Sequence, residues 1–327
     1  MGRPGEENLS SSARRDLEGP VPASALPRIV HAPQYTLEWP GHVFPTFKYR
    51  RVRERLLAEG IAKEEDFIRP EKASREDLLL VHTAGYLDRL EAMTARPDLG
   101  YLEFEAPCTR EVLDAFLYMA GGSILAGRLA VEGGVGVNLG GGFHHAFADR
   151  GEGFCALNDI AVALRVLQRE EAIERALVVD LDLHQGNGTA RIFQGDDSVF
   201  TFSIHQENNY PIKERSDLDV GLEDLAGDDV YLAALREHLP NVFDRSRPDL
   251  VAYVAGADPY EHDQLGGLRL TKAGFAERDR LVFGAARERG VPVLAFLAGG
   301  YAREPEDVVD IHVAMAREAL SGSRRGR

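Results

Sequence analysis

The sequence lacks three features that would place it in other classes of protein. It has two cysteines among 327 residues, Cys108 and Cys155, and neither belongs to a CxxC pair. This excludes a disulfide framework and a cysteine-based structural zinc site, and it favours a reducing, cytoplasmic location. Basic residues are in deficit, with 38 Lys and Arg against 53 Asp and Glu, so the formal net charge of −15 disfavours direct nucleic-acid binding. No run approaches the ~20 apolar residues of a membrane-spanning helix, so we expect no membrane attachment.

What is present is an α/β pattern between two polar ends. Residues 1–27 are rich in Ser, Pro, Gly and Arg without hydrophobic periodicity, which predicts a flexible N-terminal leader. Residues 321–327 form a basic C-terminal tail. Between them, over residues 28–320, short apolar runs alternate with longer amphipathic stretches. This alternation predicts a central, mostly parallel sheet flanked by helices.

The apolar runs and the amphipathic stretches give the expected positions of the elements. Strands are expected at Arg28–His31, Leu78–His82, Gly134–Asn138, Ala176–Asp182, Val199–Ile204, Leu250–Ala255 and Val291–Leu297. Helices are expected at Lys48–Glu59, Arg110–Glu132, Asn158–Arg169, Asp229–Phe243, Lys272–Arg289 and Glu306–Leu320. Because ligands bind at the carboxyl ends of the strands in open α/β sheets, polar residues that follow several strands should meet in one pocket. Two helical histidines, His238 and His312, are expected at the surface or at an interface.

The segment DLDLHQGNGT supplies candidate metal ligands directly after an apolar strand. Alternation with a period of two places Asp180, Asp182 and His184 on one face. An isolated DxD is about as often a helix cap or a solvated loop, but adjacent buried carboxylates repel each other unless a cation compensates them. Asp258, after the apolar strand LVAYVAGAD, adds a second oxygen ligand to Asp182 and His184. Three protein ligands leave one position open, as catalytic zinc sites do.

Further candidate catalytic residues follow other strands in glycine-rich segments. His144 and His145 come after the turn Gly140–Gly142, and an imidazole beside a metal site can take a proton from water and return it to a leaving amine. Tyr301 could donate a hydrogen bond to a developing oxyanion, although a lone tyrosine at a strand end is more often a packing residue. A dinucleotide-binding site is excluded because Leu139 stands where the third glycine of that motif belongs.

Taken together, these segments resemble the histone deacetylase superfamily over roughly residues 28–320. The matching motifs are, in order, HVFPTFKYRRVRERL, VHTAGYLDRL, GGGFHHAFADRGEGFC, LNDIAVAL, DLDLHQGNGT, FSIH, AGADPYEHDQLGGLRLT and AGGY. The resemblance implies a single catalytic domain with an arginase/deacetylase-like α/β fold. It implies a zinc-dependent amide hydrolase that removes acyl groups from acylated lysine of a protein or from a small acylated amine. One Zn²⁺ per chain would be bound by Asp182, His184 and Asp258.

The resemblance also implies roles for the residues around the metal. Asp180 would be the carboxylate partner of His144, and Tyr301 would polarise the substrate carbonyl. In the expected reaction, His145 takes the proton of the attacking water. Phe154 and Tyr210 are expected along the substrate channel. A K⁺ or Na⁺ ion would lie at a structural site formed by Asp180, Asp182, His184 and Ser203.

One position departs from the common pattern of the superfamily. Many members carry Asp where this chain has Asn187, the expected partner of His145. Together with NNYPIKERSDLDVGL, this residue resembles the class IV branch and its bacterial relatives. An Asn partner orients the ring but supplies no negative charge, so we expect His145 to act more readily as a neutral base.

Three other functions stay open at this point. The first is an acetylpolyamine-type amidohydrolase, which needs the same metal site. The second is an arginase-like ureohydrolase with two manganese ions, which is disfavoured because Asp180 is required beside its histidine and GNG offers no further acid. The third is an inactive acyl-lysine binding module, which is disfavoured because no catalytic position is missing. The length of the acyl chain, the choice between zinc and iron, and the oligomeric state are not predicted.

Overall fold

The computed structural model describes residues 29–37, 39 and 42–321. The predicted leader and all but the first residue of the predicted tail lie outside these residues. In the described part of the chain, one sheet of eight strands runs in the order β2-β1-β3-β8-β7-β4-β5-β6. All of its strand pairs are parallel. The strands are β1 (Ile29–Val30), β2 (Phe67–Ile68), β3 (Val135–Asn138), β4 (Ala176–Asp180), β5 (Val199–Gln206), β6 (Leu218–Leu222), β7 (Leu250–Val254) and β8 (Val293–Phe296).

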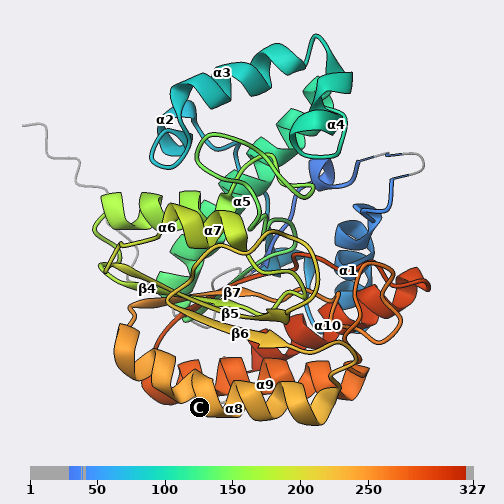
Figure 1. Ribbon diagram of the computed structural model, residues 1–327, viewed down its shortest axis with the longest axis vertical. Helices are drawn as coiled ribbons and strands as arrows, with labels where there is room; N and C mark the ends of the chain where they lie inside the picture. The colour runs from blue at the N-terminus through green and yellow to red at the C-terminus, as the bar shows by residue number, and fades with distance from the viewer. Residues whose placement is uncertain (1–28, 38, 40–41, 322–327) are drawn as a thin grey trace, which may run out of the picture.

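Helices cover both faces of the sheet (Figure 1). They are α1 (Phe47–Ala58), α2 (Arg75–Leu78), α3 (Ala84–Met93), α4 (Gly100–Glu103), α5 (Arg110–Gly133), α6 (Asp159–Arg169), α7 (Asn187–Ile192), α8 (Asp228–Ser246), α9 (Lys272–Arg289) and α10 (Pro305–Ser321). Short 3-10 turns lie at Pro33–Tyr35, Glu64–Asp66 and Pro97–Leu99. Helices α5, α6 and α7 lie on one face, and α8, α9 and α10 lie on the other (Figure 1). The predicted α/β fold with a sheet between helices is therefore confirmed.

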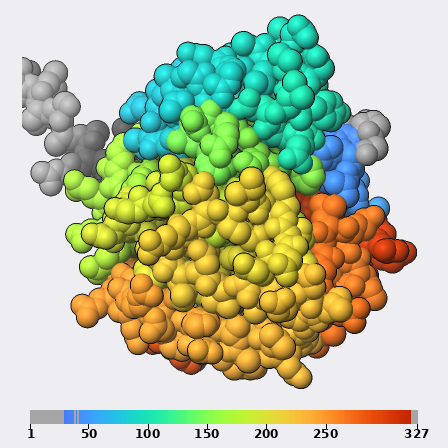
Figure 2. All heavy atoms as spheres, in the orientation of Figure 1, coloured from blue at the N-terminus to red at the C-terminus, as the bar shows by residue number. Residues whose placement is uncertain are grey.

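Helices α2, α3 and α4 lie together at one end of the molecule. In the space-filling view, they lie at the end opposite α8 and α9, which are orange (Figure 2). Side-chain caps begin several helices in this half: Thr83 accepts a hydrogen bond from Tyr86 N before α3, and Thr109 accepts one from Val112 N before α5. Each cap satisfies a backbone N–H in the first turn of its helix and so sets where that helix begins.

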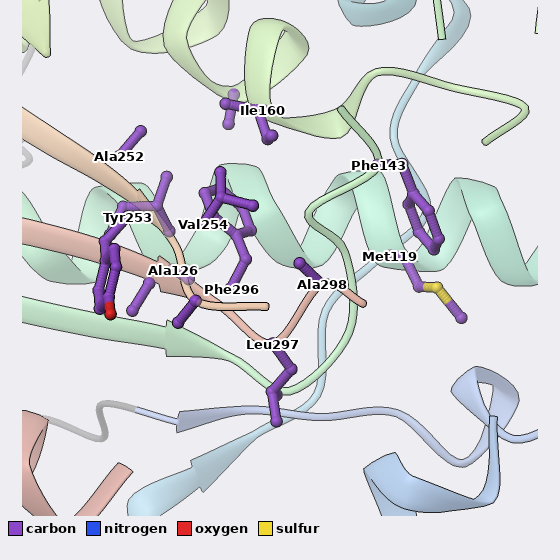
Figure 3. Packing of buried hydrophobic residues seen from close by; sticks show 14 of the residues in the cluster. Met119, Ala126, Phe143, Ile160, Ala252, Tyr253, Val254, Phe296, Leu297 and Ala298 are labelled. Atoms are coloured by element: carbon purple, nitrogen blue, oxygen red, sulfur yellow. The ribbon is translucent and has the colours of Figure 1, made fainter. Parts of the chain in front are cut away.

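The core forms where the apolar strands meet α5 and α6. Strands β3, β4, β7 and β8 are buried at every residue, as expected for parallel strands covered on both faces. Figure 3 shows Ile160 of α6 and Ala126 of α5 beside Val254 of β7 and Phe296 of β8. These central strands are rigidly packed, which fixes the positions of the loops that follow them.

Most predicted elements are confirmed with shifts of a few residues at their ends, but one strand is wrong. Leu78–His82 forms the end of α2 and a following turn. The reason is local: Ser74 and Asp77 form a capping box that begins a helix just before the apolar run. Leu79 and Leu80 are 45% and 36% exposed, so the run is not a buried strand.

Two further expectations about helices need correction. His312 is fully buried rather than at the surface, because α10 turns this residue toward the interior. Helix α5 is long and apolar enough to span a membrane by length and composition, contrary to the expectation that no segment approaches this. However, 72% of its most apolar window is buried within the structure, and it packs against α6 and the sheet.

Ile160 provides a test of this core. It is completely buried, whereas Ile212 is 90% exposed. Ile160→Ala should lower the free energy of unfolding by about 2–5 kcal/mol, because it removes packed methyl groups and leaves a cavity. The same substitution at Ile212 should change it by less than about 0.5 kcal/mol. Urea denaturation measures both, and equal effects at the two positions would contradict the packing described.

Candidate active site

The ends of four neighbouring strands bring the candidate site residues together. Strands β3, β8, β7 and β4 are adjacent in the sheet and parallel, so their carboxyl ends share one edge. The segments after them carry, in that order, the histidine pair, Tyr301, Asp258, and Asp182 with His184. Strand β4 ends at Asp180, two residues before the predicted end at Asp182, so Asp182 and His184 both lie in the following loop. The candidate site residues meet at this edge of the sheet even though β4 is shorter than predicted.

Asp182, His184 and Asp258 form a buried group with the geometry of a metal site. One ligand atom from each residue lies within 4.8 Å of those from the other two. His184 Nδ1 is 3.1 Å from Asp258 Oδ2 and 3.3 Å from Asp182 Oδ1. All three side chains are less than a tenth exposed. Two oxygens and one nitrogen therefore face a common point.

The backbone orients both carboxylates of this group. Gly299 N donates to Asp182 Oδ2 at 2.9 Å, and Leu183 N donates to Asp258 Oδ1 at 2.9 Å. The other oxygen of each acid is thereby directed toward His184. These donors fix the ligand directions before any cation binds, so the residues fit a divalent metal.

The electrostatics of the group show that it requires a positive charge. Burial lowers the pKa of His184, but hydrogen bonds to Asp182 and Asp258 outweigh burial and raise the pKa to about 10. Burial and the negative charge of Asp182 raise the pKa of Asp258 to about 6. Both shifts reflect two carboxylates buried together, a pair that is stabilised by a positive charge between them. A proton on His184 or a divalent metal can provide it.

His144 and His145 lie side by side next to the metal ligands. Their Nε2 atoms are 3.1 Å apart. His144 Nδ1 lies 2.8 Å from Asp180 Oδ2, and His145 Nδ1 lies 2.9 Å from Asn187 Oδ1. The structure therefore pairs each ring with the partner that the sequence predicted for it.

The pKa values of the two rings shift in opposite directions. Burial lowers the pKa of His144, but the negative charges of Asp180 and Asp182 raise it to about 9. Burial and the positive charges of His144 and His184 hold the pKa of His145 well below its ordinary value. These shifts favour a neutral His145 beside a cationic His144, although the hydrogen bond to Asn187 itself acts to raise the pKa of His145.

A buried acid that the sequence did not single out holds the loop of the histidine pair. Gly141 and Gly142 have φ of 78° and 86°, so the turn before the histidines uses a backbone conformation suited to glycine. Asp159, at the start of α6, accepts hydrogen bonds from Gly142 N and from Phe143 N, the latter at 2.8 Å. It is fully buried. Its partners lie 16 and 17 residues earlier, so no local pattern could reveal this role.

Tyr301 is buried beside the metal ligands and is held through its backbone. Tyr301 N donates to Asp263 Oδ2 at 2.7 Å, and its ring packs edge-on against Phe44 and Phe154. Burial and the negative charges of Asp258 and Asp182 raise the pKa of this phenol well above its ordinary value. The hydroxyl therefore keeps its proton and can act as a donor.

Lys48 is a second buried residue that sequence reasoning missed. Its ammonium group donates to the carbonyl oxygens of Ala298 and Gly299, just before Tyr301. Burial lowers the pKa of Lys48 to about 8, although the negative charges of Asp258 and Asp182 oppose the shift. Lys48 lies within the motif HVFPTFKYR, which was identified as a whole without a role for this residue.

A funnel leads from the surface to these groups. Its outer part has a volume of about 230 Å³ and is lined by Phe154 and Tyr210, as predicted, together with Glu105 and Leu265. Its inner part holds about 20 Å³, room for one water-sized group, between Phe44, Cys155 and Tyr301. His145, His184 and Tyr301 line both parts. The funnel suits a thin chain that ends in a small group.

Ser203 lies close to the metal loop but is bonded elsewhere. It is the register partner of Asp180 across strands β4 and β5. Its hydroxyl lies 2.9 Å from His205 Nδ1, and both residues are buried. The site for K⁺ or Na⁺ at Asp180, Asp182, His184 and Ser203 stays a prediction.

Comparison with known proteins identifies relatives along nearly the whole chain. Residues 42–315 match the histone deacetylase domain family. An uncharacterized protein of Picosynechococcus sp. is 41% identical over 89% of this chain and 97% of its own length. Histone deacetylase 2 of Arabidopsis thaliana is 34% identical over 93% of this chain and 82% of its own length. The crystal structure of an HDAC homolog complexed with SAHA aligns with a TM-score of 0.76 at 26% identity, over 90% of this chain and 84% of that one.

Metal content tests the ligand group. The purified chain should carry about one divalent metal ion, and Asp258→Asn should reduce this to below about 0.2 per chain, because a ligand charge is lost. Elemental analysis by mass spectrometry after dialysis measures the content. Asp197→Asn, at an exposed acid, is the matched control and should keep the metal. Full occupancy in Asp258→Asn would contradict the ligand set, and two ions per wild-type chain would favour an arginase-like site.

Proposed function

This chain belongs to the histone deacetylase domain family, and we propose that it is a zinc-dependent hydrolase that removes short acyl groups from acylated lysine or a related amine. The observation that carries this proposal is the funnel whose inner end is lined by Asp182, His184, His145 and Tyr301. Ligands, a neutral base and a phenolic donor all border a space of about 20 Å³. A scissile amide entering this space would meet each of them.

Asp182, His184 and Asp258 would hold the Zn²⁺ ion. When bound, zinc supplies Lewis acidity that polarises an amide carbonyl and lowers the pKa of water. The charge fits, because the two carboxylates of the group need a cation. The monovalent K⁺ or Na⁺ site that includes Ser203 belongs to the same proposal, as does a cytoplasmic location.

The protein residues divide the proton transfers between them. His145, neutral and bordering the funnel, takes a proton from the attacking water and later gives it to the departing amine. His144, kept cationic by Asp180, orients the water from the other side of the pair. Tyr301 donates its phenolic proton in a hydrogen bond to the oxygen that becomes negatively charged. The proposal includes a relation to the class IV branch and its bacterial relatives, which Asn187 in place of Asp supports.

Loss of the phenol or of the base tests these roles. Tyr301→Phe should lower kcat by about 10²–10³-fold, because a donor to the developing oxyanion is lost. His145→Ala should lower kcat by about 10²–10⁴-fold, because proton transfer is lost. Steady-state hydrolysis of an acetyl-lysine peptide by the zinc-loaded chain measures both. His238→Ala, on the half-exposed surface of α8, is the control, and near-normal turnover in both site variants would contradict the assignment.

The small volume of the inner part of the funnel predicts which acyl group is removed. The inner space of about 20 Å³ is small, so a long acyl chain would have to displace buried residues such as Cys155 much further than an acetyl group would. We expect kcat/KM for acetyl-lysine to exceed that for octanoyl- and myristoyl-lysine by at least about tenfold. A panel of these peptides and acetylated polyamines measures the preference. Faster turnover of the long acyl groups would contradict the size argument, and faster turnover of acetylated polyamines would favour a small-molecule substrate.

A further inference from the structure

Glu152 is an acidic residue beside the histidine pair that the reaction described above does not use. Its Oε1 accepts a hydrogen bond from Asn187 Nδ2 at 2.7 Å and lies 3.4 Å from the hydroxyl of Tyr210. Its Oε2 faces Arg150 at 3.7 Å, and the side chain is 25% exposed. Glu152 therefore contacts the partner of His145, and not the metal ligands themselves.

The backbone holds Glu152 in a fixed position. Glu152 N donates to Cys155 O at 3.1 Å, and Cys155 N donates to Glu152 O at 2.9 Å. The two residues between them, Gly153 and Phe154, have φ of 52° and 65°, as the central residues of a type I′ turn do. A Cβ atom on Gly153 would lie 2.7 Å from His145 Cδ2, so this turn packs directly on the ring of His145.

The contacts of Asn187 leave its amide one orientation. Its Oδ1 accepts from Gly188 N at 3.0 Å, and a backbone N–H can only donate. Its Nδ2 faces the carboxylate of Glu152 and the carbonyl of Ile212, which can only accept. Reversing the amide would break the bond to Gly188 and set two acceptors against each other at Glu152. The amide oxygen therefore faces His145.

This orientation decides which nitrogen of His145 carries the proton. With an oxygen 2.9 Å away, Nδ1 of His145 must be the protonated nitrogen. Nε2 of the neutral ring is then an acceptor, and it is the nitrogen that faces His144. A base must present an unprotonated nitrogen, so this tautomer is the one that can take a proton through Nε2.

We propose that Glu152 is a positioning residue for His145, which acts through Asn187: it fixes the amide so that His145 keeps its proton on Nδ1 and its lone pair on Nε2. This inference rests on the proposed function, in which His145 is the base. It also modifies the expectation from the sequence. Asn187 carries no charge, but its amide donates a hydrogen bond to the carboxylate of Glu152.

Removal of Glu152 gives the first part of the test. In the zinc-loaded full chain, Glu152→Ala should lower kcat for an acetyl-lysine peptide about tenfold with KM changed less than about twofold. Glu152→Gln keeps an acceptor oxygen but loses the charge, and it should lower kcat about threefold. Asp149→Asn removes a charge from the same loop, beside the same Arg150, and should leave both constants unchanged. An unchanged kcat in Glu152→Ala, or a change confined to KM, would overturn the proposal.

The second part exchanges the charge between the two positions. Asn187→Asp sets two carboxylates against each other and should lower kcat at least about tenfold through their repulsion. Adding Glu152→Gln supplies an amide donor to the new acid and should recover at least about fivefold. The same Glu152→Gln substitution thus lowers kcat in the wild type and raises it in Asn187→Asp. Equal kcat values for Asn187→Asp with and without Glu152→Gln would overturn the proposal.

A readout that does not depend on turnover is the tautomer of His145. In protein labelled with ¹⁵N-histidine, the ring shifts of His145 should show a protonated Nδ1 in the wild type and a mixture of tautomers in Glu152→Ala. A single Nδ1–H tautomer in both would overturn the proposal. Metal content and thermal unfolding should be unchanged across the variants. If the wild type itself hydrolyses none of the acyl-amides tested, the proposed function fails, whereas the tautomer measurement still decides the role of Glu152.

Discussion

Two carboxylates buried side by side, Asp182 and Asp258, impose the constraint on which the rest of the site depends. Such a pair is stable only with a cation and with donors for the remaining oxygens. Adjacent strands β4 and β7 bring the acids together, and the backbone N–H groups of Leu183 and Gly299 turn one oxygen of each toward His184. A Cβ atom on Gly299 would lie 2.3 Å from Asp258 Oδ2, so this close approach requires glycine. The parallel sheet is thus what makes the charged group possible.

The parts of this structure that the sequence predicted are those with a local physical signal. Amphipathic helices such as Asp159–Arg169 follow from their periodicity, and the candidate ligands follow from polar residues placed after apolar strands. Leu78–His82 failed because a short apolar run has the same appearance in a strand and in a helix end followed by a turn. The two-residue strands β1 and β2 and the half-buried β6 have little signal of their own, and only β1 was expected.

The residues whose supporting roles the sequence did not predict act on backbone far from themselves. Lys48 bonds to carbonyl oxygens about 250 residues later, and Asp159 holds the N–H groups of a turn that precedes it in the chain. Asp263 supports Tyr301 in the same way, across 38 residues. Each is a charged side chain buried because a loop needs its hydrogen bonds, and no spacing of residues encodes such a need. The groups proposed to react, and the side chains that pair with the two histidines, were therefore predictable, whereas the charged side chains that hold the loop backbone were not.

The concentration of buried carboxylates also accounts for where charge lies around His145, with an amide at position 187 and the acid at position 152. Asp180, Asp182 and Asp258 already concentrate negative charge at the buried end of the funnel, and an acid at position 187 would add another with no direct cationic partner. At Glu152 the carboxylate stays partly exposed, where Arg150 and solvent stabilise it. The intervening amide of Asn187 transmits orientation through hydrogen bonds but does not bring the full charge against the ring. The hydrogen bond to Asn187 thereby directs the ring of His145, while burial and the positive charge of His144 hold the pKa of this ring low.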